Sequence, residues 1–249
     1  MKRLSLTLLL ATSASLILLN TSLRSEASST PSVATYQQMV EHQDRPKGDL
    51  RRDKSRLPAQ LLQFMQLKPG MTVFELGAGG GYTTELLARA VGQSGKVFSE
   101  GLNLSRVTNN RLPQVKPLER GLIYQIPDRA AAAGLKNGQV DSVVIMFTYH
   151  DLALNGRIDR QDMLHNLLAM LKPGGSLIIA DNAAVDGSGL RDTQSLHRID
   201  SQLVRKELEQ AGFTFANTST LYHNAKDDKK GHWRFMSGQH ARMLMRFTK

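Results

Sequence analysis

The chain has 249 residues, of which 41% are hydrophobic, and it carries a formal net charge of +10 at pH 7. This length and apolar content are enough for one sizeable core and predict one folded domain. Because the sequence contains no cysteine, disulfide bonds, thiolate catalysis and cysteine-ligated metals are excluded. The basic excess favours anionic surroundings or partners.

The first 27 residues have the layout of a secretory signal peptide. Lys2 and Arg3 precede an apolar run over residues 4–19, and Ser25-Glu26-Ala27 offers small residues at the −3 and −1 positions of a cleavage site. The run is short and rich in hydroxylated residues for a membrane span, which favours cleavage over an uncleaved N-terminal anchor. We therefore expect an exported, periplasmic protein with no transmembrane domain once the signal is removed.

A polar and then basic N-terminal arm, residues 28–56, is expected to precede the main domain, residues 57–249. Six basic side chains lie close together in this arm: Arg45, Lys47, Arg51, Arg52, Lys54 and Arg56. No aromatic residues interleave with them for base stacking. The cluster is therefore predicted to be a solvated basic arm rather than a nucleic-acid site.

The stretch from Val73 to Val91 holds the clearest functional pattern. Residues 71–76 are short, apolar and β-prone, and residues 82–91 place apolar side chains at helical spacing. Between them lie four glycines that can take positive φ and let a ligand approach bare backbone: Gly77, Gly79, Gly80 and Gly81. A strand, a glycine turn and a helix start together form the ligand crevice of an open α/β sheet.

Details of this turn exclude two nucleotide-binding motifs. A dinucleotide fingerprint needs a third glycine where Tyr82 stands, and a Walker loop needs a lysine, which is absent between Lys68 and Lys96. Glu75 closes the strand just before the glycines, where its carboxylate would repel a pyrophosphate but suit an ammonium group. The alternative interpretation is a glycine-rich turn that binds nothing.

Strand and helix patterns alternate along the chain. Helices are expected over residues 57–67, 82–91, 158–171 and 196–211, and strands over residues 71–76, 95–100, 118–125, 141–147, 176–181, 213–222 and 233–247. Leu-Lys-Pro-Gly occurs twice between a helix and a strand, as expected for repeated right-handed crossovers. The last two strands, with a short polar link, predict a closing antiparallel hairpin. The predicted fold class is α/β: a Rossmann-like doubly wound, mostly parallel seven-stranded sheet with that hairpin at its C-terminal end.

A family resemblance rests on five blocks of sequence. They are Glu-Leu-Gly-Ala-Gly-Gly-Gly-Tyr-Thr-Thr-Glu at 75–85, Leu-Lys-Pro-Gly at 67–70, Tyr-His-Asp at 149–151, Leu-His-Arg-Ile-Asp at 196–200 and Ala-Gly-Phe at 211–213. Through them, residues 44–249 resemble class I S-adenosylmethionine-dependent methyltransferases, and in particular a group of exported bacterial "predicted methyltransferases". The resemblance implies the fold and S-adenosylmethionine as cofactor, but it leaves the acceptor open.

The resemblance also implies the cofactor site. Its members are Glu75, Gly77, Gly79, Gly81, Tyr82 and Glu100. In the methyltransferase fold the acid that ends the second strand, here Glu100, accepts hydrogen bonds from the ribose hydroxyls. The alternative for Glu100 is an exposed glutamate at a strand end.

Tyr149, His150 and Asp151 directly follow the predicted central strand and are the candidate catalytic residues. Methyl transfer from a sulfonium needs an acceptor positioned in line and the removal of its proton. His150 is the candidate general base near neutral pH, and Asp151 is expected to orient it or to bind an amine. The alternative is that both residues only cap the next segment. Three further residues are interpreted as structural, surface or capping residues: His165, His197 and Asp200.

No metal site is predicted. Asp151, Asp181 and Asn182 offer an alternative set of hard oxygen ligands for magnesium or calcium, similar to that of catechol-type O-methyltransferases. Their spacing after the fourth strand fits that group poorly, so the set is not adopted.

The predicted function is methyl transfer from S-adenosylmethionine to a small-molecule acceptor. Two alternatives stay open: a non-catalytic protein that binds S-adenosylmethionine or a nucleoside, and a nucleic-acid methyltransferase. The Asn-Pro-Pro-Tyr-type motif of amino-methylating DNA enzymes is absent at residues 148–151, which disfavours the last. The predicted export conflicts with both methyltransferase functions, because S-adenosylmethionine is made inside cells. The sequence leaves the oligomeric state open.

Overall fold

The computed structural model describes residues 30–249 except 104, 106–110, 119–129 and 155–157. The predicted signal peptide, residues 1–27, lies outside the described residues, as does nearly all of the strand predicted over 118–125. Among the helices that are described, none combines the length and the apolar character that a membrane crossing requires.

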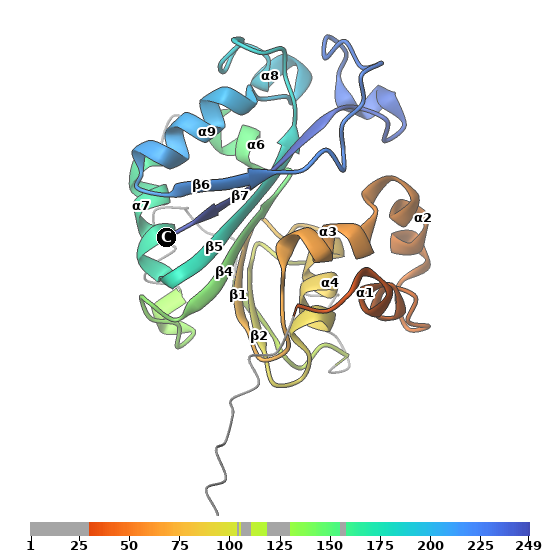
Figure 1. Ribbon diagram of the computed structural model, residues 1–249, viewed down its shortest axis with the longest axis vertical. Helices are drawn as coiled ribbons and strands as arrows, with labels where there is room; N and C mark the ends of the chain where they lie inside the picture. The colour runs from red at the N-terminus through yellow and green to blue at the C-terminus, as the bar shows by residue number, and fades with distance from the viewer. Residues whose placement is uncertain (1–29, 104, 106–110, 119–129, 155–157) are drawn as a thin grey trace, which may run out of the picture.

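Seven strands form one mixed sheet with the order β3-β2-β1-β4-β5-β7-β6 (Figure 1). The strands are β1 Thr72–Leu76, β2 Lys96–Glu100, β3 Val115–Leu118, β4 Val140–Met146, β5 Leu171–Asn182, β6 Thr214–Thr218 and β7 Arg242–Thr248. The first five are parallel, and β7 runs antiparallel to both β5 and β6. The predicted fold class is confirmed.

Helices cover both faces of this sheet (Figure 1). They are α1 Val33–Val40, α2 Lys47–Arg56, α3 Pro58–Met65, α4 Tyr82–Val91, α6 Tyr149–Leu154, α7 Arg160–Met170, α8 Thr193–Leu196 and α9 Ser201–Gln210, with the short 3-10 helix η3 at Trp233–Met236. Strand residues alternate between two apolar clusters. Val143 packs with α7 and α9 in one cluster, and Val144 packs with α1, α3 and α4 in the other.

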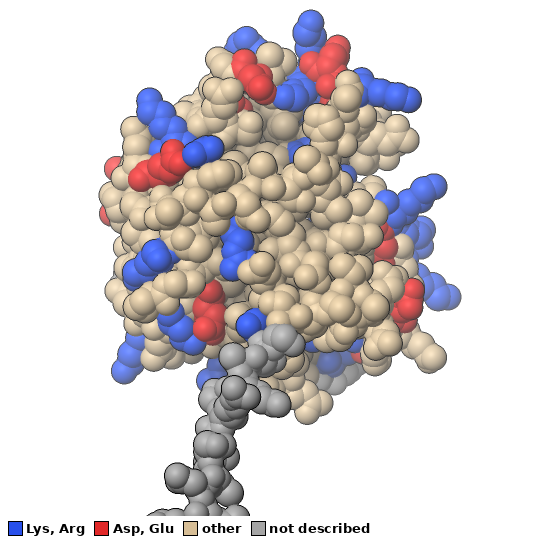
Figure 2. Space-filling view, in the orientation of Figure 1, with Lys and Arg blue, Asp and Glu red and all other residues tan. Residues whose placement is uncertain are grey.

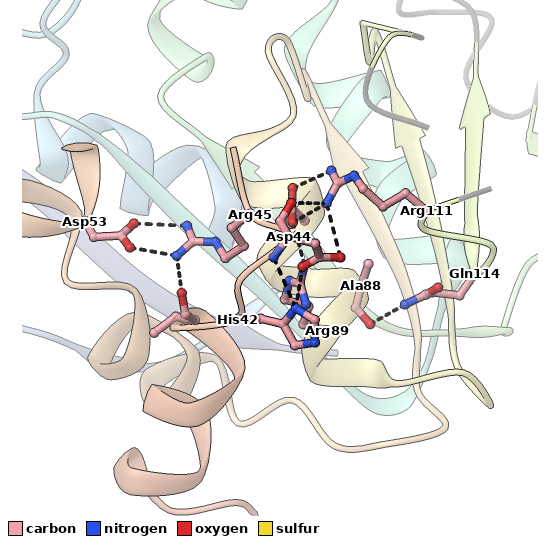
Figure 3. Close-up of polar contacts among 10 residues, drawn as sticks. His42, Asp44, Arg45, Asp53, Ala88, Arg89, Arg111 and Gln114 are labelled. Atoms are coloured by element: carbon pink, nitrogen blue, oxygen red, sulfur yellow. Dashed lines mark hydrogen bonds and ion pairs between the residues drawn. The ribbon is translucent and has the colours of Figure 1, made fainter. Parts of the chain in front are cut away.

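The segment before α3 folds into α1 and α2, and four of its six clustered basic residues are exposed, as predicted for a solvated arm, while Arg45 and Arg56 are not. Arg45 is only 3% exposed, and its guanidinium donates to both carboxylate oxygens of Asp53, at 2.7 and 3.0 Å, as Figure 3 shows. The loop between α1 and α2 is tied to α4 because Arg89 contacts both Asp44 and Glu85. Ion pairs within the segment thus neutralise part of its positive charge.

The C-terminal third departs from the predicted elements in two places. The predicted helix over 196–211 is broken, because His197 adopts a positive φ of 51° and Asp200 begins α9 as its N-cap. The predicted strand over 233–247 starts only at Arg242, since η3 and an irregular segment come first. The buried ion pair of Arg198 with Asp227, at 3.0 Å, holds this segment against the sheet. The antiparallel pairing of the last two strands is confirmed, but their link is long.

Candidate functional site

The candidate site lies where the parallel strands end. The strand order reverses between β1 and β4, and crevices at such a point are the usual ligand sites of open α/β sheets. The glycine turn follows β1, Glu100 ends β2, and the segment beginning at Phe147 follows β4. The fold therefore brings the predicted cofactor residues and the predicted catalytic segment to the same edge.

The glycine turn has the backbone that its composition predicts. Gly77, Gly79 and Gly81 have φ values of 74°, 53° and 75°. A Cβ atom at Gly77 would come within 2.6 Å of the Thr148 side chain, so glycine is required there for close packing. Around Gly79 and Gly80, by contrast, the only described atom within 4 Å of an added Cβ is the Gly77 carbonyl oxygen, at 4.0 Å. That open side of the turn can accept a ligand against bare backbone.

Glu100 lies against this turn. Its carboxylate accepts a hydrogen bond from the Gly77 amide at 3.2 Å, and its carbonyl oxygen accepts one from the Ala78 amide at 2.8 Å. The residue is 4% exposed. A carboxylate at the end of the strand beside the glycine turn suits the two hydroxyls of a ribose, and so these residues fit S-adenosylmethionine.

Glu75 and Tyr82 are placed beneath the turn rather than on its open side. Glu75 is 1% exposed and accepts hydrogen bonds from the hydroxyls of Thr84 and Ser99, at 2.5 and 2.9 Å. Burial raises its pKa to about 7 against the opposing effect of these bonds. The Tyr82 hydroxyl donates to Asp53 at 2.7 Å. Both residues hold α4 in place, whereas the prediction gave them direct contact with the cofactor.

His150 is oriented by Asp181, which is fully buried at the end of β5. The ring Nδ1 of His150 lies 2.7 Å from Asp181 Oδ1, and the main-chain amide of His150 donates to Oδ2 at 2.8 Å. This leaves the ring Nε2 directed at His197 Nδ1 and Asp151 Oδ1, each at 3.2 Å. We call His150, Asp151 and His197 the histidine cluster.

The charge state of the histidine cluster differs from the prediction. Burial acts to lower the pKa of His150, but the hydrogen bonds that its ring donates to the Asp151 and Asp181 carboxylates outweigh burial and raise that pKa to about 9. The hydrogen bond with His150 lowers the pKa of Asp151. In the free protein His150 therefore keeps its proton at neutral pH, and the predicted role of a neutral general base would require a ligand to displace that proton.

A pocket of about 370 Å³ opens beside the histidine cluster. Its lining includes four arginines: Arg52, Arg56, Arg234 and Arg242. In Figure 1, α2 and the segment that contains η3 stand on either side of this end of the sheet. The Arg56 guanidinium stacks on Tyr82 and Phe147, at 4.9 and 4.8 Å from the ring centroids. The pocket thus lies directly next to the helix that follows the glycine turn.

Arg56 holds no counter-ion within the part of the chain that the structure describes. Its guanidinium lies over the faces of the Tyr82 and Phe147 rings, and burial lowers its pKa. Arg242, by comparison, donates to the Ser55 carbonyl oxygen at 2.7 Å and stacks on Tyr222 at 4.2 Å. Partly buried guanidinium groups without acidic partners are well suited to an anionic ligand.

The structure corrects the prediction for Tyr149. Its side chain is fully buried, and its hydroxyl donates to Glu207 of α9 at 2.6 Å, so it points away from the pocket. The alternative oxygen-ligand set was Asp151, Asp181 and Asn182, and the last two already have other hydrogen-bond partners. Asp181 is engaged by His150, and the Asn182 amide donates to the His197 carbonyl oxygen and contacts His240.

The sequence analysis missed His197, which it interpreted as a surface or capping residue, and did not single out Arg234 and Arg242 of the pocket lining. His197 comes from the break between α8 and α9, and 47 residues separate it from His150. Its sequence signal was its place in the Leu-His-Arg-Ile-Asp block at 196–200, one of the five blocks that carry the family resemblance. Asp200 does cap α9, as interpreted. His165 is exposed on α7.

Comparisons with known proteins find methyltransferases. Residues 49–111 match the family model of protein-L-isoaspartate(D-aspartate) O-methyltransferase. The ubiquinone/menaquinone biosynthesis C-methyltransferase UbiE of Legionella pneumophila strain Corby is 25% identical over 135 residues, which cover 52% of this chain and 50% of that protein. The corresponding protein of Shewanella sediminis is 23% identical over 172 residues, covering 66% and 64%. The chain thus spans about half to two thirds of the length of these relatives.

Solved structures share the fold. A S-adenosylmethionine-dependent methyltransferase from Aquifex aeolicus superposes with a TM-score of 0.57 at 21% identity, covering 88% of this chain and 98% of that one. The [4+2]-cyclase SpnF also has a TM-score of 0.57, at 14% identity, covering 78% and 80%.

Together, the fold, the glycine turn and the relatives define a class: the chain has the architecture and the cofactor region of class I S-adenosylmethionine-dependent methyltransferases. The predicted class and its cofactor are confirmed at this level. The match of residues 49–111 spans most of α2 and all of α3, β1, α4 and β2, and so includes the glycine turn and Glu100.

Proposed function

We propose that this protein transfers the methyl group of S-adenosylmethionine to a small anionic acceptor bound in the arginine-lined pocket. The observation that carries the proposal is the Arg56 guanidinium, which has no acidic partner among the described residues and lies over both Tyr82, at the start of α4, and Phe147, directly after β4. It joins the cofactor crevice to the pocket. Arg56 lines the same pocket as the histidine cluster, and Tyr82 directly follows the glycine turn.

The cofactor, when bound, supplies a methyl group already activated on a sulfonium. The open side of the turn at Gly79 and Gly80 receives it, and the Glu100 carboxylate fits its ribose hydroxyls. Glu75 and Tyr82 keep the start of α4 in position. None of these residues has to take part in bond making, since the electrophile needs only alignment.

The acceptor is then positioned from two sides. Arg56 and Arg242 bind its anionic group, and the histidine cluster contacts its reacting atom. Phe147, which adopts a positive φ of 59°, turns the chain so that the pocket lies next to the strand ends. Asp151 and His197 are partly exposed to the pocket, with exposed side-chain fractions of 52% and 37%, and are the groups that can take up the acceptor proton.

A small acceptor is favoured over nucleic acid by the distribution of charge. Figure 2 shows Lys and Arg side chains scattered over the visible face with acidic residues among them, rather than gathered in one patch. Arg45 is paired with Asp53 inside the N-terminal segment. A pocket of about 370 Å³ is of the size that encloses small molecules.

The proposal is tested with Arg56→Gln, which removes the charge but keeps a polar side chain. Methyl transfer from labelled S-adenosylmethionine into small molecules of a host extract should fall about 10–100-fold, the effect of losing a charged hydrogen-bond partner. Arg51→Gln, on the same helix but outside the pocket lining, is the matched control and should transfer normally. Equal transfer by both variants would contradict the proposal.

We also propose that the protein is exported by its N-terminal 27 residues. The basic start, the apolar run and the small residues at Ser25 and Ala27 support this. The proposed location is periplasmic.

A further inference from the structure

We propose that the histidine cluster is a metal site: His150 Nε2, Asp151 Oδ1 and His197 Nδ1 bind one divalent transition-metal ion of the zinc type. The three atoms converge at the wall of the pocket, and they come from α6 and from the break between α8 and α9. Metal binding by these residues does not depend on the proposed function. The role of the ion toward an acceptor does rest on it.

The separations between the three donor atoms match those around a four-coordinate ion. His150 Nε2 lies 3.2 Å from His197 Nδ1 and 3.2 Å from Asp151 Oδ1, and the remaining pair is 3.4 Å apart. Zinc bonds of about 2.0–2.1 Å in tetrahedral geometry require donor atoms about 3.3 Å apart. The cluster is therefore a nearly equilateral triangle of the size of one tetrahedral face. An ion above its centre lies within bonding distance of all three donors, and its binding releases the proton that they share.

The surroundings fix these donors in the way that metal ligands are usually fixed. Histidine ligands commonly donate the other ring nitrogen to a carboxylate, and His150 Nδ1 lies 2.7 Å from the buried Asp181 carboxylate. Asn182 donates to the His197 carbonyl oxygen at 2.9 Å and so supports the residue at its positive φ of 51°. Backbone strain of this kind persists only where neighbours enforce it and is concentrated at functional sites.

The donor types select the metal. Two imidazoles and one carboxylate suit zinc, cobalt, nickel or iron, whereas magnesium and calcium prefer oxygen ligands alone. Three protein ligands leave a fourth position open toward the pocket, as in catalytic rather than structural zinc sites. The arginines of the pocket would repel a bare cation, so an anionic acceptor is expected to complete the coordination and to bind more tightly with the ion present.

Metal titration tests the site directly. The full chain without a histidine tag, stripped with chelator and dialysed, is titrated with Zn²⁺, Co²⁺ and Mg²⁺ by calorimetry. We expect one equivalent of Zn²⁺ and of Co²⁺, no Mg²⁺ binding, and visible absorption bands of tetrahedral intensity for the cobalt form. Absence of Zn²⁺ and Co²⁺ binding would show that the three residues are joined by hydrogen bonds alone and would overturn the proposal.

Variants locate the ion. His197→Ala and Asp151→Asn change side chains that are partly exposed, so the fold is expected to survive, which circular dichroism verifies. Each should weaken Zn²⁺ binding by more than about 100-fold, because loss of even an outer partner of a metal site costs about 10–100-fold. His165→Ala, an exposed histidine on α7, is the matched control and should bind as the parent does. Unchanged affinity in His197→Ala and Asp151→Asn would place the ion elsewhere and overturn the proposal.

A parallel titration with S-adenosylmethionine separates this inference from the proposed function. Cofactor binding without metal binding rejects the metal site and leaves methyl transfer standing. Metal binding without cofactor binding supports the metal site and rejects the proposed function.

Discussion

Asp181 accepts two hydrogen bonds from a single residue, His150: one from the ring at 2.7 Å and one from the main-chain amide at 2.8 Å. Asp181 lies one residue before the end of β5, His150 is the second residue of α6, and each is at most 3% exposed. This double contact fixes both the backbone and the ring of His150, so that its other nitrogen faces the pocket. It makes Asp181 a positioning residue for the site.

Asp181→Asn should therefore disturb the site and the fold together. The asparagine NH₂ group would face one of the two His150 donors, the ring N–H or the main-chain N–H. Two donors would then face each other, and the His150 donor would be buried without an acceptor. We expect the free energy of unfolding to fall by about 1–3 kcal/mol, the usual cost of an unsatisfied buried polar group. Urea denaturation measures the loss. Asp162→Asn, on the exposed side of α7, should unfold like the parent.

Gly79→Val should abolish binding of S-adenosylmethionine, because the side chain would fill the open space where the ligand meets backbone. Valine is also strained at the positive φ of this position. Gly189→Val, with a similar φ of 57° and open space around it, controls for that strain away from the turn. Calorimetry should find binding in Gly189→Val only. Normal binding by Gly79→Val would mean that the cofactor lies elsewhere.

Glu100→Gln should weaken cofactor binding by about 1–3 kcal/mol, since the charge that suits the ribose hydroxyls is lost. The remaining amide oxygen can still accept from the Gly77 amide, so the turn should keep its shape. Titration calorimetry gives the affinity, and a melting temperature close to that of the parent would verify the fold. An affinity equal to that of the parent would remove Glu100 from the site.

Glu75 makes the stability of the fold depend on pH. Its pKa is raised by burial from 4.5 to about 7, so the folded protein binds more protons than the unfolded chain between these values. Stability due to this group is fully present below about pH 4.5 and is lost as pH rises through 7. Glu75→Gln should remove this part of the pH dependence. Denaturation at several pH values compares the two slopes, and identical slopes would contradict the buried state of Glu75.

Export predicts a shortened chain in the native host. Intact-mass analysis should find a protein that begins near Ser28, after removal of residues 1–27. A full-length species in the cytoplasm would contradict the proposal of export.

The sequence predicted those parts of the molecule whose signals are local. The limits of α4, residues 82–91, were predicted correctly because helical spacing begins directly after the glycines. The positions of β1, β2 and β4 agreed with prediction to within one residue at each end. A run of apolar residues between turn-forming residues is recognisable as a strand from the local sequence alone. A cluster of glycines is likewise recognisable as a turn that needs positive φ.

The parts that depend on contacts between distant segments were not predicted. The local sequence around His197 does not indicate that its ring contacts His150. The local sequence around Tyr149 does not indicate that its hydroxyl binds Glu207 instead of facing the pocket. The segment before β7 is irregular because of the buried pair of Arg198 with Asp227, which joins residues 29 positions apart. Such pairings follow from the packing of the whole chain and leave no periodic pattern in sequence.

The most direct test of the account is the product of the reaction. The full chain is incubated with S-adenosylmethionine carrying a deuterated methyl group and with a small-molecule extract of the host, and the mixture is analysed by mass spectrometry after anion-exchange separation. We predict equal amounts of S-adenosylhomocysteine and one anionic product that carries the label, both reduced in Arg56→Gln. Label that appears only in neutral molecules or in nucleic acid, or no label transfer by protein that binds the cofactor, would contradict it.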